Sequence, residues 1–349
     1  MKILESMIQE GHEQLLVCSD PAVGLKALIA IHDTTLGPAC GGCRIWPHRT
    51  EEAAIEDVLR LSKAMTYKSA LAGLDLGGGK ALIIADPRTD KSEGLFRSFG
   101  RSVDTLGGRF IVAEDVGVTP QDMVHVAKET SHVVGLPIEH GGSGETSIMT
   151  GLGVYLGMKA CALEKWGSDS LEGKTVALQG FGHVAANLAP YLLSEGARLV
   201  VTDIFPDALQ RAEALGARTV APDAIYDVDC DIFSPNALGG ILNHDTIPRL
   251  KCAIVAGGAN NQLSSPEDAK ALARRGILYA PDYVINAGGI INASCEVGMA
   301  YNEARARRKT EGIYDTIQRV LRKAAAEGIT TASAADLIAE ERLQAARNP

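Results

Sequence analysis

Apolar positions along the chain follow two kinds of spacing. Short unbroken apolar runs predict buried strands over residues 25–32, 81–86 and 109–115. Residues 51–65 instead carry apolar side chains at helical spacing, with Thr50 placed as the N-cap and two glutamates in the first turn. Strands that alternate with helices in this way predict a mainly parallel sheet covered by helices.

The second half repeats this alternation around a glycine motif. A Gly-rich stretch, 133–147, is a hinge candidate, and a long apolar helix follows it. The strand TVALQG then runs into Gly180, and the next strand ends in Asp203. Gly180 permits a tight turn, Gly182 lets the backbone approach a pyrophosphate, and a small residue, Ala185, lets helix and strand pack closely.

This arrangement predicts a dinucleotide site, with a purely structural glycine turn as the alternative. The strand before the motif, the helix after it and the acid at the right distance favour the dinucleotide. The Asp203 carboxylate can accept hydrogen bonds from the hydroxyls of the adenosine ribose, and its negative charge would repel a 2′-phosphate. Because no Arg or Lys follows it in DIFPDA, NAD is favoured over NADP.

Three further apolar runs, 230–240, 252–263 and 276–294, are strand candidates that end in small or amide residues. Ligands of doubly wound sheets bind beyond the carboxyl ends of strands. Asn261 and Asn286 are therefore candidates for lining a nicotinamide and substrate crevice. A role in turns alone is the alternative for both.

Composition narrows the class of protein. A chain of 349 residues with 46% apolar residues favours two domains, and a net charge of −9 argues against nucleic-acid and membrane partners. Seven scattered cysteines, with Cys40 and Cys43 at redox-motif spacing but no second pair, predict no metal site. The acidic N-terminus does not look like a signal peptide, so the protein is expected in the cytoplasm with reduced thiols.

Lys80 stands in GLDLGGGK, which first suggests a phosphate loop. The spacing excludes this, because Leu74 stands where the first glycine should be and Ala81 where the hydroxyl should be. Glycines instead allow a small ligand close approach, and apolar neighbours disfavour a lysine's charge, which suits a general base. Lys68 is a candidate for binding a substrate carboxylate, and Asp115 is a candidate for accepting a proton. The alternative for each of the three residues is an ordinary surface charge.

With these motifs in view, nearly the whole chain resembles the amino-acid dehydrogenase family of glutamate, leucine, phenylalanine and valine dehydrogenases, and most of all its leucine dehydrogenases. The matching stretches are GHEQ (11–14), LIAIHDTTLGPA (28–39), LRLSKAMTYK (59–68), GLDLGGGK (73–80), AEDVG (113–117), ANNQL (259–263) and YAPDYVINAGG (279–289).

The resemblance implies an α/β fold of two domains with a cleft between them. Residues 1–140 would form a substrate-binding and oligomerisation domain, residues 141–327 a Rossmann-type NAD domain, and helices in 328–349 would return to the first. A homo-oligomer is expected.

The resemblance also implies roles for individual residues. Lys80 would be the catalytic lysine, Asp115 would assist proton transfer, and Lys68 would bind the α-carboxylate. The other substrate-binding residues would be Gly41, Cys40, Ala113, Asn261, Ile291 and Ser294. The cofactor-binding residues would be Thr150, at the nicotinamide carboxamide, with Gly180, Phe181, Gly182, His183, Val184, Ala185, Ala186, Asp203, Ile204, Ala237, Ala256 and Asn286.

The implied reaction is reversible oxidative deamination of an L-amino acid to a 2-oxo acid and ammonia, with NAD as cofactor. Branched-chain amino acids are the first expectation. Phenylalanine or another bulky apolar amino acid is the second, because Ala113 leaves room and because Cys40 and Ser294 depart from the usual leucine pocket. An NAD-binding regulator without turnover is a further alternative, although Lys80 and Asp115 are both present.

A 2-hydroxy-acid dehydrogenase would also have a nucleotide domain, but it would use a His–carboxylate pair as its acid and base. His32, His125 and His132 lack a partner motif of that kind and are interpreted as structural.

Overall fold

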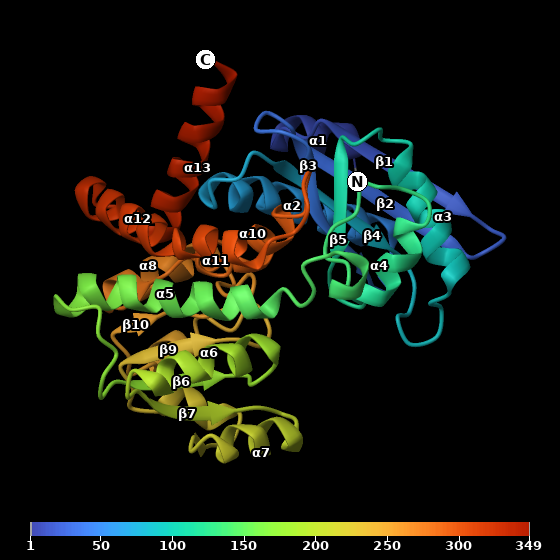
Figure 1. Ribbon diagram of the computed structural model, residues 1–349. Helices are drawn as coiled ribbons and strands as arrows, with labels where there is room; N and C mark the ends of the chain where they lie inside the picture. Colours follow the sequence, from blue (N-terminus) through green and yellow to red (C-terminus); the bar gives the residue numbers. More distant parts are fainter. Residues whose placement is uncertain (1, 349) are drawn as a thin grey trace. The chain divides into compact units, whose positions relative to one another are not determined.

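The computed structural model describes residues 2–348, which divide into two compact units (Figure 1). Among these residues, unit 1 consists of 2–146, 292–305 and 339–348, and unit 2 of 147–291 and 306–338. The sequence suggested a first boundary at 140 and a return at 328. The chain contacts instead divide it at 146 and 338, and they assign 292–305 to unit 1 as well.

Unit 1 contains five strands and the helices around them within the described residues. In chain order the elements are α1 (Ile3–Glu10), β1 (Gln14–Asp20), β2 (Leu25–Asp33), β3 (Ala39–Ile45), α2 (Glu51–Leu71), β4 (Gly77–Ile83), α3 (Glu93–Asp104), β5 (Phe110–Glu114), α4 (Pro120–Ala127) and the 3₁₀ helix η1 (Ile138–His140).

The sheet of unit 1 is mixed, with the strand order β1-β2-β4-β3-β5. β1 and β2 form an antiparallel hairpin, and β2 is also antiparallel to β4. β3 runs parallel to both β4 and β5. The hairpin departs from the mainly parallel arrangement predicted from the apolar runs, because a connection as short as 21–24 can join only antiparallel strands.

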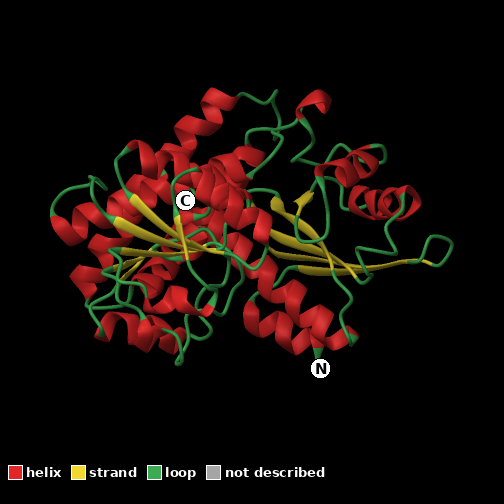
Figure 2. Cartoon of the chain, turned by 90° about the horizontal axis from the view of Figure 1, so that it is seen from below, coloured by secondary structure: helices red, strands yellow, loops and turns green. Residues whose placement is uncertain are grey.

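Helices cover both faces of this sheet (Figure 2). On one face α3 and α4 bury a core that includes Phe96, Phe99 and Phe110. On the other face α2 packs Val58 and Leu59 against β2 and β4. The predicted N-cap is confirmed, since the Thr50 hydroxyl accepts a hydrogen bond from Ala53 N at 3.2 Å, and the helix runs on to Leu71.

The elements of unit 2, and the helices that pass between the units, follow in chain order. They are α5 (Ser147–Trp166), β6 (Thr175–Gln179), α6 (His183–Ser194), β7 (Arg198–Thr202), α7 (Pro206–Ala214), β8 (Arg218–Thr219), η2 (Asp223–Asp227), β9 (Ile232–Pro235), η3 (Ile247–Arg249), β10 (Ile254–Val255), α8 (Pro266–Arg274), β11 (Leu278–Tyr279), α9 (Asp282–Ile285), α10 (Gly288–Ser294), α11 (Glu303–Glu311), α12 (Ile313–Glu327) and α13 (Thr331–Arg347).

The sheet of unit 2 is parallel throughout, with the order β11-β10-β9-β6-β7-β8. Numbered within the unit, this order reads 6-5-4-1-2-3, which is the strand order of a doubly wound dinucleotide-binding fold. The chain reverses direction across the sheet between β6 and β9. Ligands of such folds bind beyond the carboxyl ends of the strands at this point.

Two predicted strands differ from those in the structure. β4 begins at Gly77, four residues before the predicted run, so Lys80 lies inside a strand and not in a loop before it. Glycine has low strand propensity, but here the run pairs with β2 on one side and β3 on the other. The run 276–294 holds only a two-residue strand, β11, followed by α9 and α10, because a buried helix and a buried strand are both apolar.

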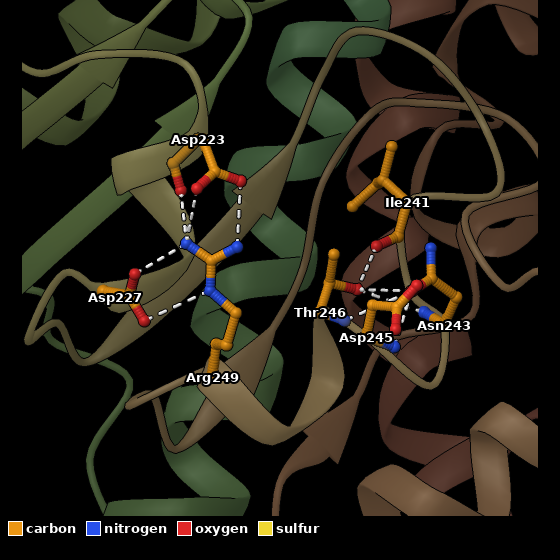
Figure 3. A network of polar contacts seen from close by, with 7 residues as sticks. All are labelled: Asp223, Asp227, Ile241, Asn243, Asp245, Thr246 and Arg249. Carbon is orange, nitrogen blue, oxygen red and sulfur yellow. Dashed lines mark hydrogen bonds and ion pairs between the residues drawn. The ribbon is translucent and has the colours of Figure 1, made fainter.

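A polar network ties together two connections of unit 2 (Figure 3). Arg249 lies 2.9 Å from Asp223 Oδ1 through Nη1 and 2.6 Å from Asp227 Oδ2 through Nη2, which joins η3 to η2. Nearby, Asn243 Oδ1 accepts a hydrogen bond from Asp245 N at 2.9 Å and closes a turn. These exposed contacts shape loops and include none of the predicted site residues.

Membrane-spanning helices, disulfides and metal-binding clusters each indicate a class of protein. Between residues 2 and 348, no helix has the length and apolar character needed to cross a membrane. All seven cysteines are free thiols. The described part of the chain holds no group of three or more His, Cys, Asp or Glu side chains arranged to bind a metal ion.

Candidate active site

The predicted substrate residues of unit 1 lie on neighbouring elements. Cys40 and Gly41 are on β3, Lys80 is on β4, Ala113 is on β5, and Asp115 follows β5 directly. Because β3 lies between β4 and β5 and runs parallel to both, these residues lie on three adjacent strands, with Cys40 near the start of β3, Lys80 in the middle of β4 and Asp115 just after the end of β5. Cys40, for example, is paired with Gly78 of β4 and with Ile111 of β5.

The last turns of α2 press directly on β4. A Cβ atom at Gly78 would overlap the backbone nitrogen and the hydroxyl of Thr66, so only glycine allows this approach. Lys68 comes two residues after Thr66, and Lys80 comes two residues after Gly78. The glycine run therefore brings the segment that carries Lys68, which is half-buried, against the strand that carries Lys80.

Lys80 and Asp115 form an ion pair, with Lys80 Nζ 2.9 Å from Asp115 Oδ2. The Lys80 side chain is 7% exposed and that of Asp115 is 20% exposed. A lysine this deeply buried beside a single carboxylate can exchange a proton with a bound ligand while bulk water is largely excluded. The sequence predicted both residues, and the structure brings them into contact.

Opposing effects set the pKa of Asp115. Burial of the carboxylate raises the pKa, but the charges and hydrogen bonds of Lys80 and Arg44 outweigh burial and lower the pKa to about 2. Asp115 is therefore an anion at neutral pH. It can accept a hydrogen bond or a proton from a positively charged group, and it orients Lys80.

Arg44 was missed by the sequence reasoning. This residue lies on β3, and its Nε donates a hydrogen bond to Asp115 Oδ2 at 3.0 Å. Its Nη1 lies 3.1 Å from Asp57 Oδ2, on α2. The partners of this arginine lie 13 and 71 residues away along the chain, so no local pattern in the sequence indicates these contacts.

Glu114, next to Asp115, was also missed, and it titrates in the opposite direction. Burial raises its pKa to about 7, the charges of Glu145 and Asp115 add to this effect, and a hydrogen bond with Thr146 opposes it. Within residues 2–348, Glu114 Oε2 is buried without a hydrogen-bond partner. Two adjacent carboxyl groups thus differ widely in proton affinity because only Asp115 has cations beside it.

The raised pKa of Glu114 predicts how stability varies with pH. Because the folded pKa lies near 7 and the ordinary value is 4.5, the folded state binds the proton more tightly. This contribution to stability is full below pH 4.5 and is lost as the pH rises through 7. Glu114→Gln keeps a neutral side chain at all pH values. It is therefore expected to exceed the native protein by about 1–2 kcal/mol at pH 8, after allowance for partial exposure.

Urea unfolding of both proteins at pH 5 and pH 8 measures this difference. The matched control is Glu139→Gln, at an exposed glutamate of η1, which should change neither value. An equal free-energy difference between Glu114→Gln and the native protein at the two pH values would contradict the prediction.

In unit 2 the glycine motif forms the predicted turn after β6. Gly180 has φ +93°, and a Cβ on it would lie 2.7 Å from the Ala237 side chain, so glycine is required on both grounds. Gly182 is the N-cap of α6, His183 begins this helix, and Ala185 is fully buried. A helix N-terminus behind such a turn presents backbone N–H groups and the positive end of the helix dipole, which fit a pyrophosphate.

Asp203 lies at the end of β7 and contacts the same turn. Its Oδ2 accepts a hydrogen bond from Phe181 N at 2.7 Å, and its Oδ1 accepts one from Phe205 N at 2.9 Å. Each oxygen keeps a second lone pair. The carboxylate is therefore fixed beside the glycine turn and can still accept hydrogen bonds from ribose hydroxyls, while Ile204 beside it is 75% exposed.

Several other predicted cofactor residues lie close to one another. A Cβ on Gly258 would meet the Val184 side chain at 2.7 Å. Asn286 Nδ2 donates to Gly258 O at 3.2 Å, and its buried Oδ1 has no partner among residues 2–348. Gly288 packs against the backbone of Thr150. A buried amide oxygen without a donor is what a ligand carboxamide would satisfy.

The remaining predicted residues have separate positions. Asn261 is exposed and has φ +52°, a left-handed conformation that is uncommon for a residue other than glycine and is often found at ligand sites. Ile291, 1% exposed, and Ser294 lie three residues apart on α10 and share one side of it. Ala186 lies on α6, and Ala256 directly follows β10.

Comparison with known families gives two matches that together span almost the whole chain. Residues 12–132 match the family described as "Glu/Leu/Phe/Val dehydrogenase, dimerisation domain". Residues 141–204 and 207–348 match "Glutamate/Leucine/Phenylalanine/Valine dehydrogenase".

Individual proteins are also similar over their full lengths. The chain is 55% identical to the leucine dehydrogenase of Thermoactinomyces intermedius, covering 99% of this chain and 95% of that one. It is 49% identical to the phenylalanine dehydrogenase of Caldalkalibacillus thermarum, covering 95% and 91%. Among solved structures, the L-tryptophan dehydrogenase of Nostoc punctiforme has a TM-score of 0.86 at 45% identity, covering 99% and 100%.

Proposed function

Because the chain belongs to the Glu/Leu/Phe/Val dehydrogenase family and is an amino-acid dehydrogenase of the leucine dehydrogenase-like type, we propose that it catalyses the reversible, NAD-dependent oxidative deamination of branched-chain L-amino acids. The products are the 2-oxo acid, ammonia and NADH. The observation that carries the proposal is the buried ion pair of Lys80 and Asp115, whose Nζ and Oδ2 atoms are 2.9 Å apart.

Unit 1 supplies the groups for binding and proton transfer. Lys68, in the last turn of α2, would hold the substrate carboxylate and so fix the direction of Cα. NAD, when bound, accepts a hydride from Cα. Lys80, as an amine, would then take a proton from the water that attacks the resulting imino acid, and Asp115 would accept a proton from the substrate nitrogen and later help return it to the leaving ammonia.

Side-chain preference would depend on buried residues near these groups. Cys40 is fully buried and Ala113 is 9% exposed, so both are available to line an apolar pocket. A methylene more or less in such a pocket is worth about 1–3 kcal/mol, so leucine, valine and isoleucine should overlap as substrates. Phenylalanine or another bulky apolar amino acid is the second candidate, because phenylalanine and L-tryptophan dehydrogenases are also similar over most of the chain.

NAD is proposed in preference to NADP because of Asp203. A 2′-phosphate would lie against this fixed carboxylate, whereas ribose hydroxyls can donate to it. Asp203→Asn removes the charge and offers only one acceptor oxygen. The KM for NAD is expected to rise about tenfold, and the preference for NAD over NADP to fall by more than that.

Initial rates with each cofactor measure both quantities. Asp207→Asn, in the exposed first turn of α7, is the matched control and should leave both KM values unchanged. An Asp203→Asn protein with native KM values for NAD and NADP would remove Asp203 from this role.

We further propose that unit 1 pairs with a second copy of the chain through β1, which lies at an edge of its sheet. Ile84 N donates to Lys26 O, so the even-numbered positions of β2 face β4 and its odd-numbered positions face β1. Through the register of β1 with β2, the backbone groups of Leu15, Val17 and Ser19 then point outward. This set is symmetric about Val17, as a two-fold axis requires.

The face beside this edge is also apolar. Val17 is 70% exposed, and α1 carries Leu4 and Ile8 at 73% and 79% exposed. Residues 12–132, which contain β1, match a dimerisation domain, and this supports a second copy as the partner. Burial of these side chains with the strand edge would remove both an apolar patch and unpaired backbone groups from water.

Val17→Pro tests the pairing, because it removes an outward N–H without breaking a bond to β2. The mass in solution, measured by light scattering, is expected to fall relative to the native protein. Leu238→Asp, at a side chain 76% exposed in unit 2, is the control and should keep the native mass. A native mass for Val17→Pro would rule out β1 as the interface.

A cytoplasmic location is proposed as well, on the ground that all seven cysteines are free thiols.

A further inference from the structure

The Asp115 carboxylate meets two cations through one of its oxygens. Lys80 Nζ lies 2.9 Å from Oδ2, and Arg44 Nε lies 3.0 Å from the same atom. Among residues 2–348 these two contacts are the hydrogen bonds and ion pairs of this carboxylate. Oδ1 therefore keeps its lone pairs for a further donor, such as the substrate amine.

Arg44 is itself held from the other side. Its Nη1 lies 3.1 Å from Asp57 Oδ2, and Asp57 Oδ1 accepts a hydrogen bond from Arg60 at 2.9 Å. The side chains of Arg44 and Asp57 are 21% and 13% exposed. A guanidinium group between two carboxylates has little freedom to rotate, and its planar donors fix the orientation of both.

Backbone register places this arginine beside Asp115. Cys43 of β3 pairs with Glu114 of β5, and the two strands are parallel, so the next residues, Arg44 and Asp115, come level with each other. Lys80 approaches from β4, on the other side of β3 from β5. On β4 the residue level with Arg44 is Leu82, so Lys80 reaches the same carboxylate from a position two residues earlier along the parallel strands.

The proposed chemistry requires Lys80 to alternate between ammonium and amine. Each time Lys80 is neutral, Asp115 loses one of its two cations. A buried carboxylate with no cation beside it has a raised pKa and would take up a proton itself. Arg44 cannot lose its charge at any working pH, so it remains as a cation when Lys80 does not.

We propose that Arg44 is a positioning residue which, anchored by Asp57, fixes Oδ2 of Asp115 toward Lys80 and keeps this carboxylate ionised while Lys80 is neutral. The inference deepens the proposed function and rests on it, because it assigns Arg44 to the same reaction.

Among residues 2–348, the cations that contact the Asp115 carboxylate are Lys80 and Arg44. The ionisable groups around Asp115 and the Arg44–Asp57 contact are Lys80 on β4, Arg44 and Cys43 on β3, Glu114 on β5, Asp57 and Arg60 on α2, and His48, whose Nε2 lies 3.5 Å from Asp57 Oδ2. Burial raises the pKa of the Cys43 thiol well above its ordinary range, and that of Glu114 is about 7. Removal of Arg44 should therefore change the titration of Asp115 directly.

The first test compares the pH dependence of kcat for the native enzyme, Arg44→Met and Arg44→Lys in the deamination of leucine. In Arg44→Met, kcat is expected to fall about tenfold to a hundredfold, and the acid limb to move up by about one pH unit or more, with the KM for NAD unchanged. Arg44→Lys keeps the charge and should keep the acid limb near its native position. A fall in kcat with an unmoved acid limb would indicate a structural role alone and overturn the proposal.

The second test does not depend on turnover. Aspartate carboxyl carbons are labelled with ¹³C, the Asp115 signal is identified by its loss in Asp115→Asn, and its pKa is followed by NMR in Lys80→Met, where residue 80 is always neutral. The pKa should stay low in Lys80→Met and rise by about two units when Arg44→Met is added. Equal pKa values in the two proteins would overturn the proposal.

A third variant guards against misfolding of the double variant. Lys80→Met combined with Asp57→Asn removes the carboxylate that anchors Arg44 but retains the charge of Arg44. The pKa of Asp115 is expected to rise less than in Lys80→Met with Arg44→Met. No rise would count against the anchoring role. If the native protein deaminates no amino acid at all, the proposed function fails. The NMR comparison still decides whether Arg44 controls Asp115.

Discussion

We expect Lys80→Ala to abolish detectable turnover and to leave NAD binding intact. The expected loss in kcat is about 10²–10⁴-fold, the range that a positioned acid–base group contributes. Lys80 is 7% exposed, so bulk water cannot readily replace its amine. Lys80 and its ion-pair partner Asp115 belong to unit 1, whereas the glycine turn and Asp203 belong to unit 2. Steady-state rates of NADH formation give kcat, and calorimetric titration gives the affinity for NAD.

Two further variants sharpen this prediction. Lys80→Arg keeps the positive charge but cannot act as a base near neutral pH, so it should be nearly as inactive as Lys80→Ala. Lys26→Ala, at an exposed lysine of β2, should be fully active. Substantial turnover in Lys80→Arg would mean that the charge alone matters and that Lys80 is not the base.

Asp115→Asn is expected to lose both activity and stability. In the native protein Lys80 and Arg44 both lie within 3.0 Å of Asp115 Oδ2. The neutral amide of asparagine no longer compensates their two positive charges, which then repel each other. It also holds Lys80 less firmly and is a poor proton acceptor. We expect kcat to fall by about 10²–10³-fold and the free energy of unfolding at pH 7 to fall by about 2 kcal/mol.

The stability difference depends on pH in a defined direction. The pKa of Asp115 is about 2 in the folded state and 3.8 ordinarily, so its ionisation contributes stability above pH 3.8, and this is lost as the pH falls through 2. Urea unfolding at pH 7 and at pH 3 should therefore show a smaller gap between the native protein and Asp115→Asn at pH 3. Asp104→Asn, at an exposed aspartate of α3, is the control, and a gap that is larger at pH 3 would contradict this account.

The sequence predicted the two side chains of the proposed proton transfer, Lys80 and Asp115, but not the residues around them. Lys80 was singled out because its glycine context failed as a phosphate loop, and Asp115 because it follows an apolar run. Arg44 and Asp57 are joined through the register of β3 with β5 and the packing of α2, which depend on contacts far apart in the chain. The raised pKa of Glu114 likewise depends on burial and on Glu145 and Asp115, and the local sequence shows neither the burial nor the contact with Glu145.

The fold was predicted best where local chemistry is strongest. The N-cap at Thr50 depends only on the threonine hydroxyl. The turn at Gly180 depends only on the absence of a side chain, which allows a positive φ. β4 was placed too late because glycines carry no strand signal, and β11 was extended too far because α9 and α10 are as apolar as a strand. The antiparallel pairing of β2 with β4 has no local signal, since it depends on strands 25–33 and 77–83 meeting in space.

The most direct test of the central claim is the rate of NADH formation from NAD and single L-amino acids. The panel consists of leucine, valine, isoleucine, phenylalanine, tryptophan and glutamate. The account predicts the highest kcat/KM with leucine, valine or isoleucine, and none of this activity in Lys80→Ala. A highest rate with phenylalanine or tryptophan would keep the mechanism and contradict the substrate, and no NADH with any of the six would contradict the proposed function itself.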